Sequence, residues 1–210
     1  MQVFLYIIGG IIILALLWLV FTYNSLVKKR NQVQEAWSDI DVQLKRRHNL
    51  IPNLVDSVEG YMDHEKSTLQ NVTKYREQAE QARNEGNTKQ LAQIEDKLSS
   101  ALGNLQVAVE DYPELKASQN VSELMDELSD TENKIQAARR FYNGQVRDLN
   151  TKIESFPTNI VAGALGFGQR EYYEVEDEGV RENVDVDLQS ESDQSGGVSG
   201  SQSKESSESN

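Results

Sequence analysis

Apolar side chains follow one another without a break near the start of the chain. From Val3 to Thr22 the sequence holds 17 apolar residues, two Gly and one Thr. As a helix with a rise of about 1.5 Å per residue, this run is about 30 Å long, which matches the hydrocarbon core of a bilayer. It is longer than the apolar part of a signal peptide, and no small-x-small cleavage site ends it. Residues 1–23 are therefore predicted to be a single transmembrane anchor.

The rest of the apolar pattern is periodic and is typical of amphipathic helices that pack side by side. Apolar residues recur at spacings that alternate between three and four over residues 33–61, 91–108 and 124–156. A repeat near seven residues favours coiled-coil-like packing, and no strand-like alternation competes with it. The predicted fold class is all-α, with an antiparallel helical bundle over residues 24–170. The residues predicted to be buried include Trp37, Leu44, Ile135 and Leu149.

Two capping boxes indicate where helices begin. In each, an Asn is followed three residues later by a residue whose side chain can reach back to the backbone: Asn87 with Gln90, and Asn120 with Glu123. Pro157 ends the last periodic stretch, because proline cannot continue a helix. These signals predict helices that begin near residues 88 and 121.

Helix lengths suggest one further break. A single helix over residues 31–84 would be about 81 Å long and would leave half of its apolar seam uncovered. A break near Gly60–Asp63 gives four helices of matched length with short turns. The alternative keeps the long helix and covers its seam by self-association. Pro52 lies inside the first seam, where we expect a local kink.

Charge next to the anchor predicts its orientation. Residues 1–27 carry no charged side chain, and Lys28, Lys29 and Arg30 follow at once. Basic residues are retained on the cytoplasmic side, so we expect the amino terminus outside and the bundle in the cytoplasm. The alternative treats the three basic residues as an interfacial anchor without topological meaning.

The net charge of −13 is concentrated at the end of the chain. Residues 171–210 hold 12 acidic and 2 basic residues, are rich in Ser, and contain no aromatic residue after Tyr173. Such a segment cannot bury enough apolar surface to fold, so a disordered acidic tail is predicted. No basic stripe with interleaved aromatic residues occurs, which disfavours nucleic-acid binding. The absence of Cys excludes disulfides and suits the cytosol.

Arg47 is the most informative charged residue of the periodic region. It falls on the apolar seam, where an unpaired charge is costly, and Glu132 is its expected partner on a facing helix. We therefore predict a structural ion pair between Arg47 and Glu132. The alternative places both residues on a solvated or partner-binding surface.

The sequence offers no catalytic, cofactor or metal site. His64-Glu65 opens a near match to a zinc-peptidase motif, but Thr68 stands where the second His is needed. Gly163–Gly168 lacks the Lys-Ser/Thr ending of a phosphate loop. The Gly-rich stretch has two other readings: close packing at a bundle end, or docking on the membrane surface through Ile160, Leu165 and Phe167.

Several long strings resemble the LemA family of bacterial membrane proteins. They include RNQVQEAWSDIDVQLKRRHNLIPNLVDSVEGY, YPELKASQNVSELMDELSDTENKIQAARRFYNGQV and FPTNIVAGALGF, and the resemblance covers roughly residues 1–173. It implies an amino-terminal membrane helix and a helical-bundle domain, and it supplies no catalytic residues. LemA-like proteins have no established biochemical activity. They are often encoded beside membrane peptidases, and one relative is associated with building intracellular membrane organelles.

Together with the resemblance, these observations predict a non-catalytic scaffold or adaptor anchored in the bacterial inner membrane rather than an enzyme. Its expected partners are the lipid bilayer and an unidentified membrane protein, and it could form a homo-oligomer. The first alternative is an accessory regulator of a neighbouring membrane peptidase. An enzyme with no recognisable site is the remaining alternative.

Overall fold

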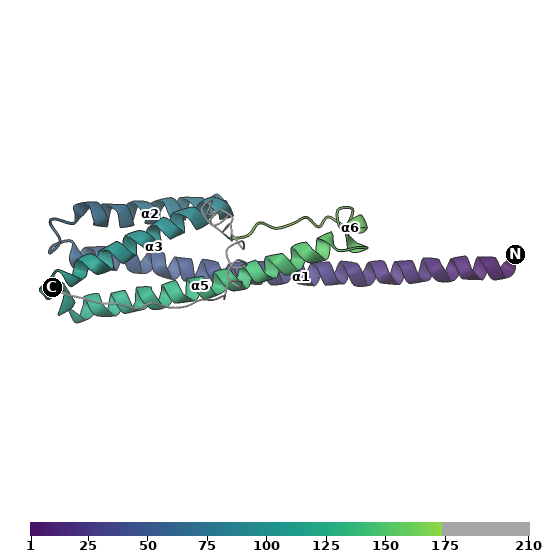
Figure 1. Cartoon of the computed structure of the whole chain (residues 1–210), viewed down its shortest axis with the longest axis horizontal. Coiled ribbons are helices and arrows are strands. Elements are labelled where there is room, and N and C mark those ends of the chain that lie inside the picture. Colours follow the sequence, from purple (N-terminus) through teal and green to yellow (C-terminus); the bar gives the residue numbers. More distant parts are fainter. Residues whose placement is uncertain (174–210) are drawn as a thin grey trace, which may run out of the picture. The chain divides into compact units, whose positions relative to one another are not determined.

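The computed structural model describes residues 1–173, and regular structure in this range is entirely helical (Figure 1). The helices are α1 (Gln2–Val58), α2 (Lys66–Asn84), α3 (Thr88–Glu110), α4 (Pro113–Lys116), α5 (Gln119–Glu154) and α6 (Thr158–Val161). The predicted all-α class is confirmed. The acidic tail predicted to be disordered is residues 171–210, of which residues 174–210 lie outside the described residues.

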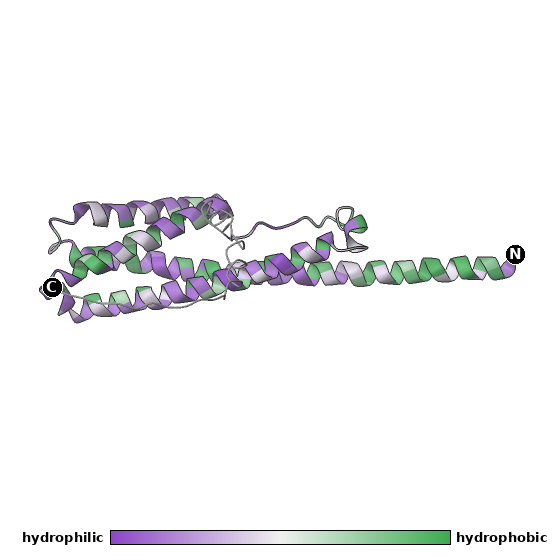
Figure 2. Ribbon diagram, in the orientation of Figure 1, coloured by the Kyte–Doolittle hydropathy of each residue, from purple (hydrophilic) through white to green (hydrophobic). Residues whose placement is uncertain are grey.

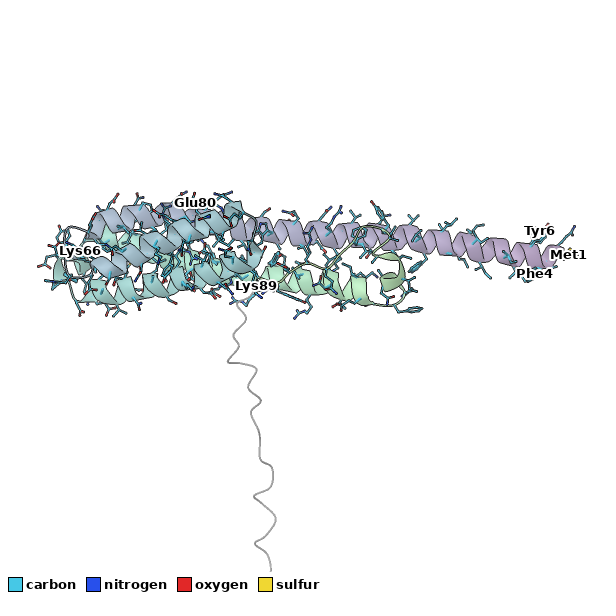
Figure 3. All side chains as sticks on the ribbon, turned by 90° about the horizontal axis from the view of Figure 1, so that it is seen from above. Met1, Phe4, Tyr6, Lys66, Glu80 and Lys89 are labelled. Atoms are coloured by element: carbon cyan, nitrogen blue, oxygen red, sulfur yellow. The ribbon has the colours of Figure 1, made fainter. Side chains whose placement is uncertain are left out.

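One continuous helix, α1, carries both the apolar run and the first seam of the bundle. Its amino-terminal part is apolar and extends beyond the other helices (Figures 1 and 2). Phe4 and Tyr6 are 65% and 78% exposed, and both stand out from α1 (Figure 3). Among the described residues, α1 alone is long and apolar enough to cross a membrane. Burial inside the protein begins at Thr22.

The break expected in the first long helix is confirmed. Pro52 lies inside α1, which continues through it and ends at Val58. Turns lead to α2, which begins at Lys66. A single helix over residues 31–84 is therefore wrong. Tyr61, the last residue of the predicted seam over residues 33–61, is exposed, and Met62 is buried in its place, because helical spacing no longer applies once α1 has ended.

The bundle pairs α1 with α5 and α2 with α3 (Figure 1). Leu44, Ile135 and Leu149 are buried as predicted, whereas Trp37 is half-buried. Buried apolar side chains form two clusters. On α1, the first cluster uses residues 26–44 and the second begins at Ile51.

Helix ends follow local chemistry, and one of the two predicted caps is wrong. The Asn87 Oδ1 atom accepts from the Gln90 amide at 3.0 Å, which confirms Asn87 as the N-cap of α3. The reciprocal half of the box is not formed, because Gln90 Oε1 accepts from Asn87 Nδ2 and the Asn87 backbone amide donates to the Ala82 carbonyl. Helix α5 instead begins at Gln119 after Ser118, so Asn120 lies in its first turn. Gly86 and Gly166 have φ of 70° and 78° and end helical turns in the left-handed conformation, which glycine adopts without steric cost.

Candidate functional site: a buried charge cluster

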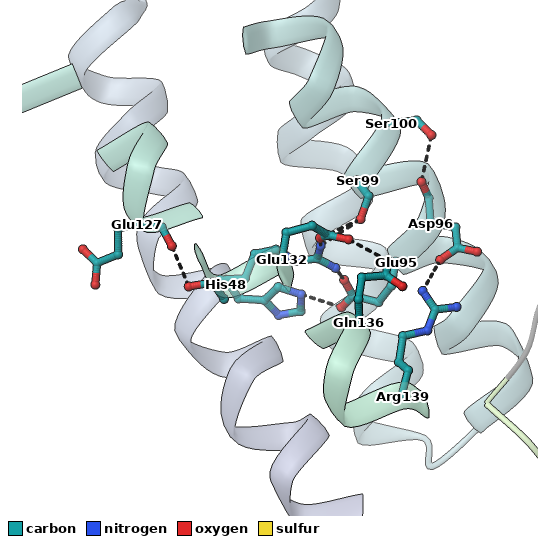
Figure 4. Close-up of polar contacts among 11 residues, drawn as sticks. His48, Glu95, Asp96, Ser99, Ser100, Glu127, Glu132, Gln136 and Arg139 are labelled. Carbon is teal, nitrogen blue, oxygen red and sulfur yellow. Dashed lines mark hydrogen bonds and ion pairs between the residues drawn. The ribbon is translucent and has the colours of Figure 1, made fainter. Parts of the chain in front are cut away.

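Three helices bring charged side chains together inside the bundle (Figure 4). We define the charge cluster as Arg47 and His48 of α1, Glu95 and Ser99 of α3, and Glu132 of α5. Arg47 lies three residues after Leu44 and four before Ile51, so it takes a core position on α1. Glu95 and Ser99 are four residues apart and therefore share one face of α3.

The charge cluster lies between the two apolar clusters on each of its three helices, α1, α3 and α5. On α3, Leu91 to Ile94 belong to the first apolar cluster and Leu98 to Val109 to the second, and Glu95 lies between them. On α5, Glu132 lies between Leu128 of the second cluster and Ile135 of the first. The core is thus two apolar blocks with a polar layer between them.

The Arg47 guanidinium joins the three helices. Its Nη2 atom donates to Glu95 Oε2 and its Nη1 atom to Glu132 Oε2, so the structure brings together the two residues predicted to pair. Nη1 also donates to the Ser99 hydroxyl at 2.8 Å, and that hydroxyl donates to Glu132 Oε2 at 3.0 Å. One cation therefore holds a carboxylate on each of two other helices.

Glu95, which the sequence reasoning missed, is the more deeply buried counter-charge. The side chains of Arg47 and Glu95 are each 1% exposed, whereas that of Glu132 is 31% exposed. His48 Nε2 lies 2.8 Å from Glu95 Oε1. Burial by itself raises the pKa of Glu95, but the hydrogen bond from His48 and the charge of Arg47 together outweigh it and hold that pKa below its usual value.

Further contacts extend the cluster toward the end of the described chain. Arg139 of α5 donates from Nη1 to Asp96 Oδ1 at 2.7 Å. Its Cζ atom lies 4.8 Å from the centroid of the Tyr173 ring, a cation–π contact. Tyr173 is buried, and its ring centroid is 5.9 Å from that of Trp37. Burial raises the pKa of Tyr173, and the nearby Glu95 carboxylate adds to the rise.

Two Asn side chains of α5 hold the last described residues, which we call the strap (residues 168–173). Asn150 accepts from the Arg170 amide at 2.8 Å and donates to the Arg170 carbonyl at 2.9 Å. Asn143 does the same with Tyr173, at 2.8 and 3.1 Å. Asn143 and Asn150 are seven residues apart on a helix, and Arg170 and Tyr173 are three residues apart in extended chain, and both separations are about 10 Å. The two pairs of hydrogen bonds can therefore form at the same time. Bundle packing thus reaches Tyr173, beyond the boundary expected at residue 170.

The basic residues after the apolar run contact the far end of α5 and the Gly-rich stretch. Lys29 Nζ is 2.8 Å from Asp148 Oδ2. The Cζ atom of Arg30 lies 5.4 Å from the centroid of the Phe167 ring, and Lys28 is exposed. These three residues therefore sit where the bundle begins beside the candidate membrane span.

The chemistry of the charge cluster is that of charge pairing. Ser99 donates to a carboxylate and His48 is paired with Glu95. Among residues 1–173, no group of three or more His, Cys, Asp or Glu side chains is placed to hold a metal ion. The absence of a metal or cofactor site stays a prediction. The arrangement can fix three helices relative to one another.

Comparison with known proteins tests the resemblance to the LemA family. The profile of the LemA family matches residues 36–188, so the match extends past residue 173, where the resemblance was expected to end. The chain is 32% identical to Protein LemA of Metamycoplasma hominis over 164 residues, which cover 78% of this chain and 73% of that protein. It is 26% identical to Magnetosome protein MamQ 2 of Paramagnetospirillum magneticum, over 74% of this chain and 66% of the relative.

Another magnetosome protein matches with similar identity and coverage. The chain is 25% identical to Magnetosome protein MamQ of Magnetospirillum gryphiswaldense, over 74% of this chain and 65% of the relative. The chain thus spans about two thirds of the length of these magnetosome proteins. The family match covers most of the chain, and identity to Protein LemA extends over nearly three quarters of that relative. This chain therefore belongs to the LemA family.

Proposed function

We propose that this protein is a non-catalytic scaffold or adaptor anchored in the bacterial inner membrane, with its amino terminus outside and its bundle in the cytoplasm. The observation that carries the proposal is the continuity of α1, which holds the apolar run and the bundle seam in one helix, Gln2–Val58. A continuous helix transmits the position of its membrane span directly to the bundle. The bundle is thereby held at a fixed place beside the bilayer, as a scaffold requires.

The use made of the charge cluster supports a non-catalytic role. Arg47 is committed to carboxylates of two other helices and His48 to Glu95. Side chains whose polar atoms are already bonded to neighbouring helices are poorly placed to attack or protonate a substrate. The basic residues Lys28, Lys29 and Arg30 support the proposed orientation, because such residues are retained on the cytoplasmic side.

Crosslinking in native membranes tests the proposal. A photo-crosslinking residue placed at the exposed positions Val42, Val107 or Phe141 should capture a discrete membrane protein or a second copy of this chain. The matched control carries residues 1–30 on an unrelated soluble domain. Capture by the bundle of only the proteins that the control also captures would refute a scaffold role. Capture of a membrane peptidase would identify the protein as an accessory of that enzyme.

A further inference from the structure

One stretch of the described chain is free of charge in a protein otherwise rich in charged residues. From Ser155 to Gln169 there is no Asp, Glu, Lys, Arg or His, although 26% of the whole chain is charged. Glu154 and Arg170 flank this stretch. We call residues 155–169 the interfacial segment. It includes the short helix α6 and the turn at Gly166.

The interfacial segment packs on α1 immediately after the apolar run. The ring centroids of Phe167 and Tyr23 are 5.7 Å apart in an edge-on contact, and Arg30 covers the same Phe167 ring. Leu26 belongs to one apolar cluster with Ala162 and Phe167. Figure 1 shows α6 beside α1 at the end of the bundle from which the amino-terminal part of α1 extends.

The dimensions of a bilayer place this contact at the lipid headgroups. If the apolar run Val3–Thr22 fills the hydrocarbon core, Tyr23 lies at its boundary. The headgroup region on each side is about 5–8 Å thick, which corresponds to about three to five residues of helix. Phe167, in contact with Tyr23, therefore lies at headgroup level, where aromatic side chains concentrate.

Two large apolar side chains of the segment are left uncovered by the protein. Phe156 is 80% exposed and Ile160 is 69% exposed. In a cytoplasmic loop this apolar surface would face water. At headgroup level it would contact the boundary between headgroups and acyl chains, where apolar side chains are stabilised.

The charged residues around the segment suit an anionic membrane surface. Residues 22–30 and 147–171 together hold six basic and three acidic residues. The Asp148 carboxylate is paired with Lys29, and Glu154 accepts from Gln169 Nε2 at 2.5 Å. A net positive collar is attracted to anionic headgroups, whereas the acidic tail is repelled by them.

We infer that the interfacial segment is a second membrane contact, which inserts Phe156 and Ile160 into the lipid interface beside the transmembrane span. Its occupant is the lipid surface itself, because the segment packs against α1 where the span ends and carries no charge. Two contacts, one spanning and one interfacial, prevent the bundle from rotating about or tilting on a single helix. This inference requires membrane anchoring but is independent of any protein partner.

Single-cysteine labelling of the full chain tests the inference, because the chain contains no Cys. Ile160→Cys carries a fluorophore in vesicles of equal parts phosphatidylcholine and phosphatidylglycerol, with spin-labelled lipid as the quencher. The matched control is Val107→Cys, at 66% exposure against 69% for Ile160. Val107 lies near the end of α3, away from the span. Quenching at position 160 should exceed that at position 107 by about threefold or more, because only the interfacial label reaches the acyl boundary.

A second variant separates insertion by the segment from insertion by the label. Phe156→Glu in the Ile160→Cys background should abolish the excess quenching and leave the circular dichroism spectrum unchanged, since Phe156 is exposed. Equal quenching at positions 160 and 107 would overturn the inference, as would undiminished quenching in the Phe156→Glu variant. Fluorophore contact between copies in place of lipid quenching would also overturn it and would assign the segment to self-association. Flotation with the vesicles verifies the anchor separately, so failure of the anchor is distinguishable.

Discussion

Removing the Arg47 guanidinium should destabilise the bundle strongly. Arg47→Ala leaves Glu95 buried, at 1% exposure, with His48 as its remaining hydrogen-bond partner within the charge cluster. Breaking a buried ion pair by removing one partner costs about 3–5 kcal/mol, because the other charge stays desolvated. Glu132→Ala should cost less, about 1–2 kcal/mol, since Glu132 is 31% exposed and water can replace part of its contact. The ranking follows from burial and not from the number of hydrogen bonds.

Double-mutant cycles should measure the Arg47–Glu95 and Arg47–Glu132 interactions separately. The double variants Arg47→Ala/Glu95→Ala and Arg47→Ala/Glu132→Ala should each lose clearly less stability than the sum of their single changes. Residues that share a network show coupling energies of about 0.5–3 kcal/mol, and we expect a larger coupling energy for Arg47–Glu95 than for Arg47–Glu132. The free energy of unfolding is measured by urea titration of the chain without residues 1–23, followed by circular dichroism.

The neighbouring residue Arg46 provides a matched control. It pairs with Glu127 across the same two helices, α1 and α5, at 2.7 Å, but both side chains are exposed. Exposed pairs contribute little, so Arg46→Ala should change the urea midpoint only slightly. Coupling within about 0.3 kcal/mol of zero for both Arg47 pairs would refute the reasoning. Arg47 and Glu132 would then belong to a solvated or partner-binding surface.

The loss of stability at low pH provides an independent test of the role of Glu95. The pKa of Glu95 in the folded bundle is lowered, so its ionised form contributes stability above its unfolded pKa of about 4.3. That contribution is lost as pH falls through the folded value. Glu95→Gln should therefore lose less stability than the parent between neutral pH and acid, measured by urea unfolding at each pH. An equal loss in both proteins would show that Glu95 is not part of the acid response.

Four further outcomes are expected. Truncating Leu44 or Ile135 to Ala should each cost about 2–5 kcal/mol in urea unfolding, because both side chains are almost fully buried. Asn143→Ala should lower the melting temperature by releasing the strap at Tyr173, whereas Asn143→Asp, which keeps only the acceptor, should lower it less. Deleting residues 174–210 should leave the melting temperature nearly unchanged, and a large drop would contradict the predicted disorder of the tail. A reporter active only in the cytosol should be active when fused after Gly168, and cleavage of the bundle by external protease in intact cells would reverse the orientation.

Much of the fold could be predicted because it depends on periodicity and length. A charge-free run as long as a bilayer is thick, and seams that repeat near every seven residues, constrain structure without knowledge of tertiary contacts. The break after Val58 followed from matching helix lengths, since an uncovered seam is unstable in water. Arg47 was identified because a lone charge on an apolar seam requires a partner.

The remainder depends on rotations and contacts that spacing does not determine. Glu95 follows the core residue Ile94 and lies one turn after Leu91, at the edge of the apolar stripe, so only the rotation of α3 decides whether it points inward. The start of α5 was predicted two residues too late because its N-cap residue, Ser118, makes no side-chain capping hydrogen bond, so the capping pattern at Asn120 was misleading. The strap could have been found from two Asn residues seven apart on α5, a signal too weak to use alone.

The position of the charge cluster explains how a repetitive sequence specifies one arrangement of helices. Apolar seams that repeat every seven residues pack almost equally well after one helix slides by a heptad. Such a shift of α3 would place Thr88 or Leu102 opposite Arg47 instead of Glu95. Arg47 and Glu95 would then be buried without each other as partners, at a cost of several kcal/mol per unpaired ion. We infer that the polar layer between the two apolar blocks fixes the register of the bundle. Because α1 is continuous, the same register sets how far the bundle stands from the membrane.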